Sequence, residues 1–105
     1  MGAIGAGESR PFKKVLTGEL AGATSATQLP DIPCRMVKFK AQADNAGAVY
    51  LGAAGVTKSD GTTDTTSGYE LDAGDETGWL LVDNLSRLYR ICDNAGDDLL
   101  YVALR

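Results

Sequence analysis

The chain has 105 residues, of which 44% are hydrophobic, with a net charge of -4 and a pI near 4.6. This length fits one domain with a modest core, and the acidic balance argues against sequence-independent binding of nucleic acid, which needs an excess of Lys and Arg. No apolar run approaches the roughly 18 residues of a membrane span, and Met1–Gly7 lack the basic-then-apolar layout of a secretion signal, so we expect synthesis in the cytoplasm.

Composition divides the chain into two parts. Residues 1–11 are rich in Gly and Ala and offer no face to bury, so we expect a mobile N-terminal arm that either frays or orders against a partner. Residues 12–105 are predicted to form a single β domain. Its strand-like runs fall at 12–20, 34–43, 48–51, 69–76, 77–82, 87–92 and 99–104. Helical periodicity is missing, so about seven to eight short strands predict an all-β antiparallel sandwich or barrel.

The clearest strand of the chain surrounds a basic pair. Val37 and Phe39 fall on one face, and Lys38 and Lys40 fall on the other. This period of two predicts one buried and one wet face. The basic face is either a solvated sheet face or a docking surface for an acidic partner.

The other segments differ in apolar content. Pro30 and Pro33 lie close together, which predicts an extended connection or a sheet edge. The glycines of 52–56 suggest a bend, and 57–68 has no aliphatic or aromatic residue, so it should be an exposed loop. The run 99–104 is nearly all apolar, and we expect it in the middle of a sheet with both faces covered.

One phrase, Asp-Asn-Ala-Gly, occurs twice, at 44–47 and at 93–96. Asp and Asn tolerate left-handed backbone angles, and Gly adopts a positive φ without a steric cost. Each copy lies between two strand-like runs, so each predicts the turn of a β-hairpin. The matching flanks are either the remnant of a duplication or a chance match.

The sequence lacks the residue combinations that common catalytic and metal-binding sites need. Histidine is absent, which excludes Ser-His and Cys-His nucleophile pairs. Cys34 and Cys92 lack the second pair that a zinc site needs; we interpret them as reduced and partly buried, with a bridge between them as the alternative. Asp60 and Asp64 lack the rhythm of a calcium loop. We therefore expect no enzyme, no cofactor, and neither catalytic nor metal-ligating residues.

The large aromatic side chains allow two readings. They either fill the core and contacts between subunits, which is where large rings are usually buried, or form a platform on which sugars stack. These residues are Tyr50, Tyr69, Trp79, Tyr89 and Tyr101.

Three phrases within residues 34–105 carry a family resemblance. They are Asn-Ala-Gly-x-Val-Tyr-x-Gly at 45–52, Leu-x-x-Gly-Asp at 71–75 and Asp-Asn-Leu-x-x-Leu-Tyr at 83–89. Together they resemble small virion proteins of tailed bacteriophages. The resemblance implies an all-β structural subunit, with capsid decoration (cement) as the expected role. Such proteins commonly sit as trimers on the outside of a head, and the family offers no catalytic residues.

The resemblance implies a homo-oligomer, expected to be a trimer, that binds the lattice of the major capsid protein and becomes part of the virion. The expected contacts with the shell come from the arm and the basic strand: Ala3, Ile4, Arg10, Phe12, Lys38 and Lys40. Neither nucleic acid nor a membrane is an expected partner. The alternatives are a carbohydrate-binding or host-attachment module, and a head–tail connector or tail subunit.

Overall fold

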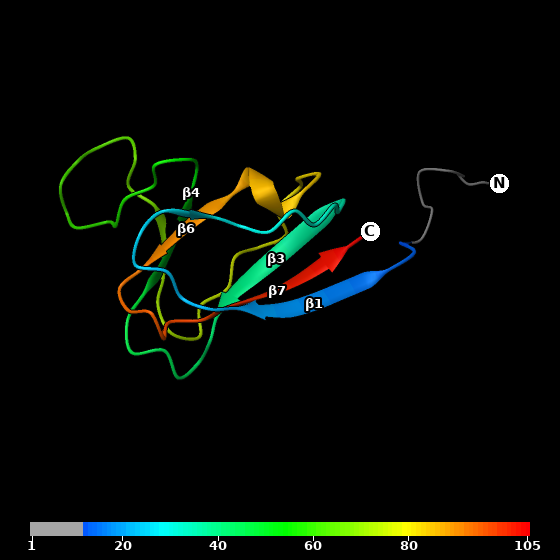
Figure 1. The fold of residues 1–105 in the computed structure, drawn as a ribbon, viewed down its shortest axis with the longest axis horizontal. Helices are drawn as coiled ribbons and strands as arrows, with labels where there is room; N and C mark the ends of the chain where they lie inside the picture. The colour runs from blue at the N-terminus through cyan, green and yellow to red at the C-terminus, as the bar shows by residue number, and fades with distance from the viewer. Residues whose placement is uncertain (1–11) are drawn as a thin grey trace.

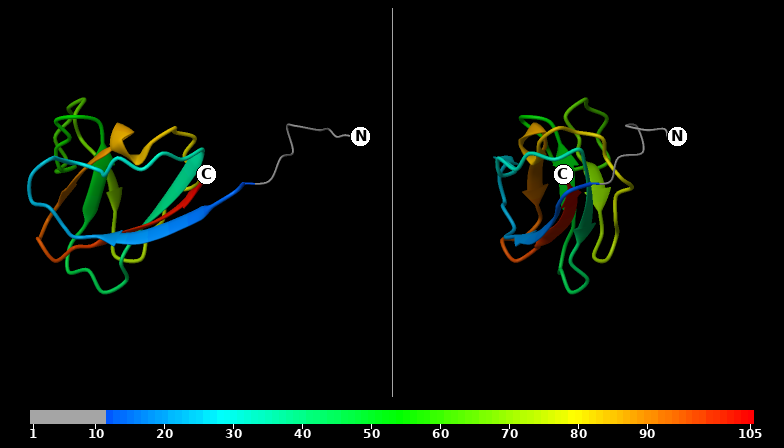
Figure 2. Two further views of the ribbon diagram at one scale, coloured as in Figure 1. Left: turned by 45° about the vertical axis from the view of Figure 1, so that its right-hand side comes forward. Right: turned by 90° about the vertical axis from the view of Figure 1, so that its right-hand side faces the viewer.

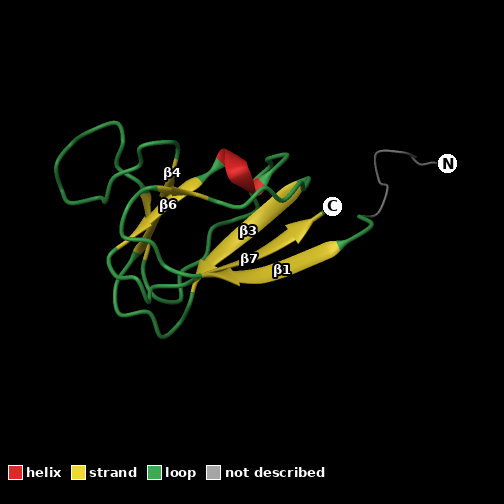
Figure 3. Cartoon of the chain, in the orientation of Figure 1, coloured by secondary structure: helices red, strands yellow, loops and turns green. Residues whose placement is uncertain are grey.

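The computed structural model describes residues 12–105, so the expected arm lies outside the described residues. Seven strands and one short helical turn make up the described chain (Figures 1 and 3). The strands are β1 (Val15–Leu20), β2 (Thr27–Gln28), β3 (Met36–Ala41), β4 (Val49–Gly52), β5 (Tyr69–Leu71), β6 (Tyr89–Cys92) and β7 (Leu99–Leu104). The helical turn, η2, spans Leu85–Arg87.

The strands form two antiparallel sheets. One has the order β1-β7-β3 and the other the order β2-β6-β4-β5. Figure 2 shows β1, β7 and β3 as one layer and the strands of the second sheet as another. The prediction of an all-β antiparallel sandwich is therefore confirmed.

The core lies between the two sheets. β3 alternates between half-buried and buried residues, as its period of two predicts. Its neighbour in the sheet, β7, adds the buried residues Leu99 and Ala103. The inner faces, the η2 turn and the segment before β3 together bury an apolar cluster. Its largest fully buried side chains are Leu29, Val37, Phe39, Val49, Leu71, Leu85, Cys92 and Leu99.

The two Asp-Asn-Ala-Gly phrases do not close hairpins, so that prediction is wrong. β3 and β4 lie in different sheets, and so do β6 and β7, which means that each phrase carries the chain across the sandwich (Figure 1). The strands pair between the copies instead: β3 with β7, and β4 with β6. Two arches therefore stack antiparallel on each other. Turn residues such as Asp, Asn and Gly suit an arch as well as a hairpin, because the sheet that a strand joins depends on its distant neighbours.

The buried carboxylate of Asp97 joins the two arches. Its Oδ1 accepts hydrogen bonds from the N–H groups of Ala46 (3.1 Å) and Gly47 (3.0 Å) in the other arch. Its Oδ2 accepts from the N–H (2.8 Å) and the side-chain amide (3.0 Å) of Asn94. Asp97 is only 1% exposed. One side chain thus satisfies donors from both turns.

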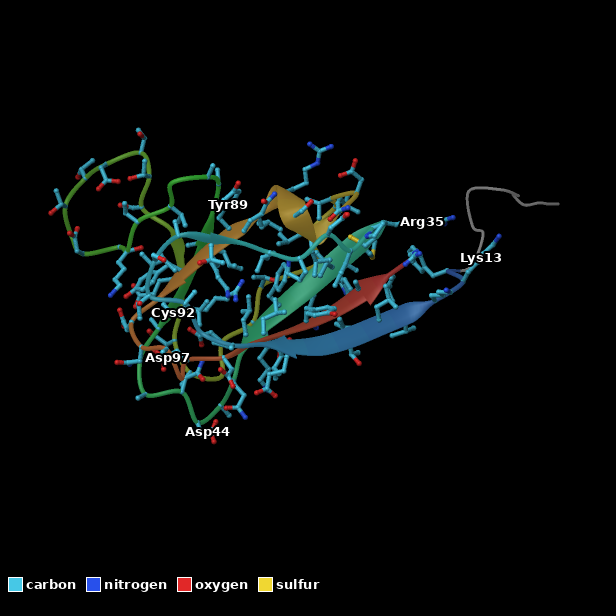
Figure 4. All side chains as sticks on the ribbon, in the orientation of Figure 1. Lys13, Arg35, Asp44, Tyr89, Cys92 and Asp97 are labelled. Carbon is cyan, nitrogen blue, oxygen red and sulfur yellow. The ribbon has the colours of Figure 1, made fainter. Side chains whose placement is uncertain are left out.

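Further bonds between the arches reinforce this contact. The side chain of Asn45 donates to the carbonyl of Asp98 and accepts from its N–H, both at 2.9 Å. Asp93 Oδ2 accepts from the N–H of Ala48 at 2.9 Å. The repeated phrase is therefore a clasp between two arches, and Figure 4 shows Asp44 and Asp97 at that end of the molecule.

The glycines of the two Asp-Asn-Ala-Gly phrases do not supply the positive φ angles that the turn prediction assumed. Neither Gly47 nor Gly96 has a positive φ. A Cβ on Gly47 would lie 2.6 Å from the Cβ of Asp93, so this position requires close approach of the two arches, whereas a Cβ on Gly96 would meet nothing within 4 Å. The glycines with positive φ in the described chain are Gly55, Gly61 and Gly74.

Four predicted strands are shorter in the structure: 12–20 is reduced to Val15–Leu20, 34–43 to Met36–Ala41, 69–76 to Tyr69–Leu71 and 87–92 to Tyr89–Cys92. β5 ends at Leu71, because the next residues form a turn in which the N–H of Asp75 donates to the carbonyl of Asp72 at 2.8 Å. β6 begins at Tyr89, because Asn84 caps η2 through a bond from the Ser86 N–H to its side chain (2.9 Å).

The predicted strand at 77–82 is not a regular strand. The segment runs beside β3 and forms a bridge between Leu80 and Val37. The N–H of Phe39 donates to the side-chain hydroxyl of Thr77 (2.9 Å), while the Thr77 N–H donates to the Phe39 carbonyl (2.8 Å). A side chain therefore takes the place of a backbone acceptor, and the ladder is interrupted there.

Replacing Gly22 by Ala should destabilise the fold by about 1–3 kcal/mol, the usual cost of overpacking. A Cβ there would lie 2.7 Å from the carbonyl oxygens of Asn94 and Ala95 and 2.8 Å from that of Asp97, all of them backbone atoms of the second arch. Urea unfolding measures the change. Gly96→Ala is the matched control, because it adds the same methyl group in open space nearby; equal losses would contradict the explanation.

Candidate interaction surface

The three-stranded sheet turns one face away from the core, and we name this the outer face. The register of β1, β7 and β3 places its side chains in three rows. The rows are Val15–Leu104–Met36, Thr17–Val102–Lys38 and Glu19–Leu100–Lys40. The central strand, β7, therefore contributes only apolar side chains to a face that the described chain leaves open.

The outer face corrects part of the prediction for β7. The strand is central, as expected, and its inward side chains Leu99 and Ala103 are fully buried. Its outward side chains, Leu100, Val102 and Leu104, stay half-buried. Coverage of both faces would need a layer that residues 12–105 of a single chain do not provide.

An irregular segment extends the outer face beyond β3. Leu80 is hydrogen-bonded to Val37 through the backbone and packs against the core. Since alternate residues of an extended segment point to opposite sides, Trp79 and Leu81 project outward, and they are 45% and 79% exposed. Exposed apolar side chains gathered on one surface are typical of an interaction site.

Lys38 lies at the centre of the extended surface. Its Nζ is 3.1 Å from Glu76 Oε1 and 5.6 Å from the centroid of the Trp79 ring. An open hollow of about 220 Å³ adjoins it, lined by Lys38, Lys40, Glu76 and residues 100–102. Sites for small molecules are usually larger, about 300–1,000 Å³, so this hollow suits one or two side chains of a partner.

The structure brings together only part of the predicted contact set. Lys38 and Lys40 lie on the outer face, where Lys38 is paired with Glu76. Phe12 is 41% exposed, and its ring lies 5.7 Å from the guanidinium carbon of Arg35. Ala3, Ile4 and Arg10 lie outside the described residues.

The five aromatic residues do not share one surface. Tyr50 is buried in β4, and Tyr89 and Tyr101 are half-buried. Tyr69 (67% exposed) belongs to β5 of the four-stranded sheet, whereas Trp79 flanks the three-stranded one. The exposed rings thus belong to different layers.

Tyr50 belongs to the clasp rather than to a surface. Its hydroxyl lies 3.3 Å from Asp93 Oδ1. Burial, then the negative charge of Asp93, raises the pKa of Tyr50 to about 12. Lys58 Nζ approaches the same carboxylate at 3.6 Å and connects the loop 57–68 to the second arch.

The described residues hold no group of three or more His, Cys, Asp or Glu side chains that would bind a metal ion. Cys34 and Cys92 are buried free thiols, as expected, and burial raises the pKa of both, which keeps them protonated and poorly nucleophilic. Helices long and apolar enough to cross a bilayer are likewise missing from the described part.

The sequence reasoning missed Leu81 and the partnership of Lys38 with Trp79. The segment 77–82 was predicted only as a strand, and which segment borders β3 depends on long-range pairing that local pattern does not give. Comparison with models of known families, with curated proteins and with solved structures finds no match.

Proposed function

We propose that the chain is a structural subunit of a tailed-phage virion, a capsid decoration protein that binds the outer surface of the head and stabilises it. The observation that carries the proposal is the open apolar outer face, with β7 at its centre and Trp79 and Leu81 at its border. The family resemblance of residues 34–105 supplies the kind of particle. The subunit acts as a homo-oligomer, a trimer, on the lattice of the major capsid protein.

The outer face gives this proposal its physical basis. Burial of apolar surface stabilises a contact by about 25 cal/mol per Å². The outward side chains of β7 are only half-buried, so a partner that covers them would gain this stabilisation. A ligand that binds the assembled lattice and not its dissociated subunits stabilises the lattice by mass action. The subunit therefore strengthens a shell by contact alone.

The experiment is cosedimentation of the purified chain with heads that lack it, followed by heating. We expect saturable binding and a higher temperature of DNA release, and light scattering should give a compact trimer in solution. A larger ring would favour a connector, and a monomer with no affinity for heads would contradict the proposal.

A second candidate, a carbohydrate-binding module, is favoured by one observation, the exposed ring of Trp79. Trp79→Ala discriminates between the two. We expect it to weaken binding to heads, with no glycan bound by either protein on an array; glycan binding that the variant loses would favour the second candidate. Tyr69→Ala, which removes an exposed ring from the other sheet, is the matched control.

A further inference from the structure

Four cations gather at the end of the three-stranded sheet where β1 begins, and we name this group the basic end. Lys13 and Lys14 precede β1, Arg35 precedes β3, and Arg105 follows β7. The N–H groups of Lys13 and Lys14 both donate to the Arg105 carbonyl, at 2.7 and 3.0 Å. The Arg35 N–H donates to the carbonyl of Leu104 at 2.8 Å. Neighbouring strands lie about 4.8 Å apart, so three strands place these residues within roughly 10 Å.

The charges of the basic end are not neutralised by described residues. All four side chains are exposed, and none is in an ion pair with residues 12–105, unlike Lys38, Lys58 and Arg87. The separation is comparable to the Debye length of about 8–10 Å at physiological salt, so the like charges repel one another. This arrangement costs stability in the free chain and favours an anionic partner.

Asp83 is an acidic residue near the basic end, but its carboxylate already forms an ion pair. The carbonyl of Asp83 accepts from the N–H of Cys34, next to Arg35, at 3.0 Å. Its carboxylate is already held by Arg87, with bonds of 2.8 and 3.1 Å. The basic end thus keeps its charge, although Asp83 lies close by.

Apolar side chains are mixed with these cations. Phe12 is 41% exposed with the Arg35 guanidinium above its ring, and Val15, the first residue of β1, is 67% exposed. Arg and aromatic residues are enriched where proteins contact each other. The mixture fits a protein surface on which carboxylates border an apolar patch.

We propose that the basic end is a docking site for an acidic surface of another protein. The inference rests on the proposed function, in which that surface belongs to the shell. It adds a second basic contact to the predicted one at Lys38 and Lys40, and this second group is free of ion pairs within residues 12–105, whereas Lys38 is paired with Glu76.

A compact acidic patch suits the charge distribution better than a nucleic acid does. Outside the basic end, six Lys and Arg face fourteen Asp and Glu, a balance of -8. An extended polyanion would be repelled by the acidic rest of the chain, whereas a protein that touches only the basic end would not. Figure 4 shows Lys13 and Arg35 at one end of the molecule and Asp44 and Asp97 away from it.

The test uses a fluorescently labelled hexaglutamate peptide as the probe, which spans about 20 Å when fully extended and can therefore cover one end of the molecule, and anisotropy as the readout. We expect Lys14→Glu/Arg35→Glu to weaken binding at least tenfold. The control Lys58→Glu/Thr63→Asp/Thr65→Asp changes the net charge equally, in the loop 57–68, and should stay within about twofold of the unmodified chain. Thermal melts confirm that all three proteins fold.

Equal losses of affinity in both variants would overturn the proposal, because the net charge alone would then explain the binding. The absence of binding by the unmodified chain would overturn it as well. Tighter binding of a six-nucleotide single-stranded oligothymidylate than of hexaglutamate would assign the basic end to nucleic acid instead. Amide chemical shifts should change at 12–15, 35–36 and 104–105, and changes centred elsewhere would also overturn it. None of these assays uses the phage head, so cosedimentation tests the proposed function separately.

Discussion

Replacing Asp97 by Asn should lower the free energy of unfolding by about 3 kcal/mol or more. The carboxylate accepts four hydrogen bonds, from Ala46, Gly47 and twice from Asn94, and bonds to a charged group contribute about 1.5–3 kcal/mol each. An Asn side chain has one acceptor oxygen, and its NH₂ group would face N–H donors that then lose their partner. The donors of one of the two arches would be left unsatisfied, whichever way the Asn side chain is turned.

Urea unfolding measures this loss, and Asp98→Asn is the matched control. The Asp98 side chain lies beside Glu19, and its hydrogen bond and charge raise the pKa of Glu19. Removing that negative charge relieves a repulsion and leaves the backbone bonds between Asp98 and Asn45 in place. We expect unchanged or slightly higher stability; a loss as large as that of Asp97→Asn would refute the special role of the clasp.

The pH dependence gives a second measure of the same carboxylate. Burial pushes the pKa of Asp97 upward, but the bonds from Gly47, Asn94 and Ala46 outweigh it, so its pKa lies below the usual value. An unfolded Asp titrates near pH ~3.9. The stabilisation is therefore complete above that pH and is lost as the pH falls through the lower, folded-state pKa. The stability gap between the unmodified chain and Asp97→Asn should shrink in that acid range.

On the proposed function, replacing Val102 by Glu should weaken binding to phage heads at least tenfold and leave the fold intact. Val102 sits in the middle row of the outer face, between Thr17 and Lys38, and is half-buried. A carboxylate there stays hydrated in the free chain, but a partner that covers the face would have to bury it, which costs several kcal/mol. Cosedimentation measures the binding, and light scattering measures the oligomeric state.

The neighbouring residue provides the control. Ala103 is fully buried on the opposite side of β7, so Ala103→Glu should prevent stable folding, whereas Val102→Glu should melt near the temperature of the unmodified chain. Full binding to heads by Val102→Glu would rule out the outer face as the contact. A common loss of folding in both variants would show that the outer face is structural.

Local pattern predicted the strands but not their partners. The alternation around Val37 and Phe39 follows from a period of two within one segment, and β3 was therefore predictable. The arches were not, because Asp, Asn and Gly make a tight turn whether the next strand stays in the sheet or crosses to the other. The irregular segment beside β3 depends on Thr77, whose hydroxyl takes the place of a backbone acceptor.

The candidate site was predictable to a similar extent. Lys38 and Lys40 were singled out by the contrast between a basic strand and an acidic chain, and both lie on the outer face. The basic end was not, because Lys14, Arg35 and Arg105 come from three separate segments. Only the pairing of β7 with β1 and β3 brings them together.

The loop 57–68 lies at the opposite pole from the basic end (Figure 1). It is held at its base by a bond between the Thr57 and Thr66 hydroxyls (2.9 Å). Its tip at Gly61 is open, with a φ of 90°, and a methyl group added there would meet no atom within 4 Å. Exposed tips of this kind tolerate inserted sequence. Under the proposed docking through the basic end, a guest peptide placed after Gly61 would be displayed on the side away from the partner, whereas one fused next to Lys13 or Arg105 would obstruct the contact.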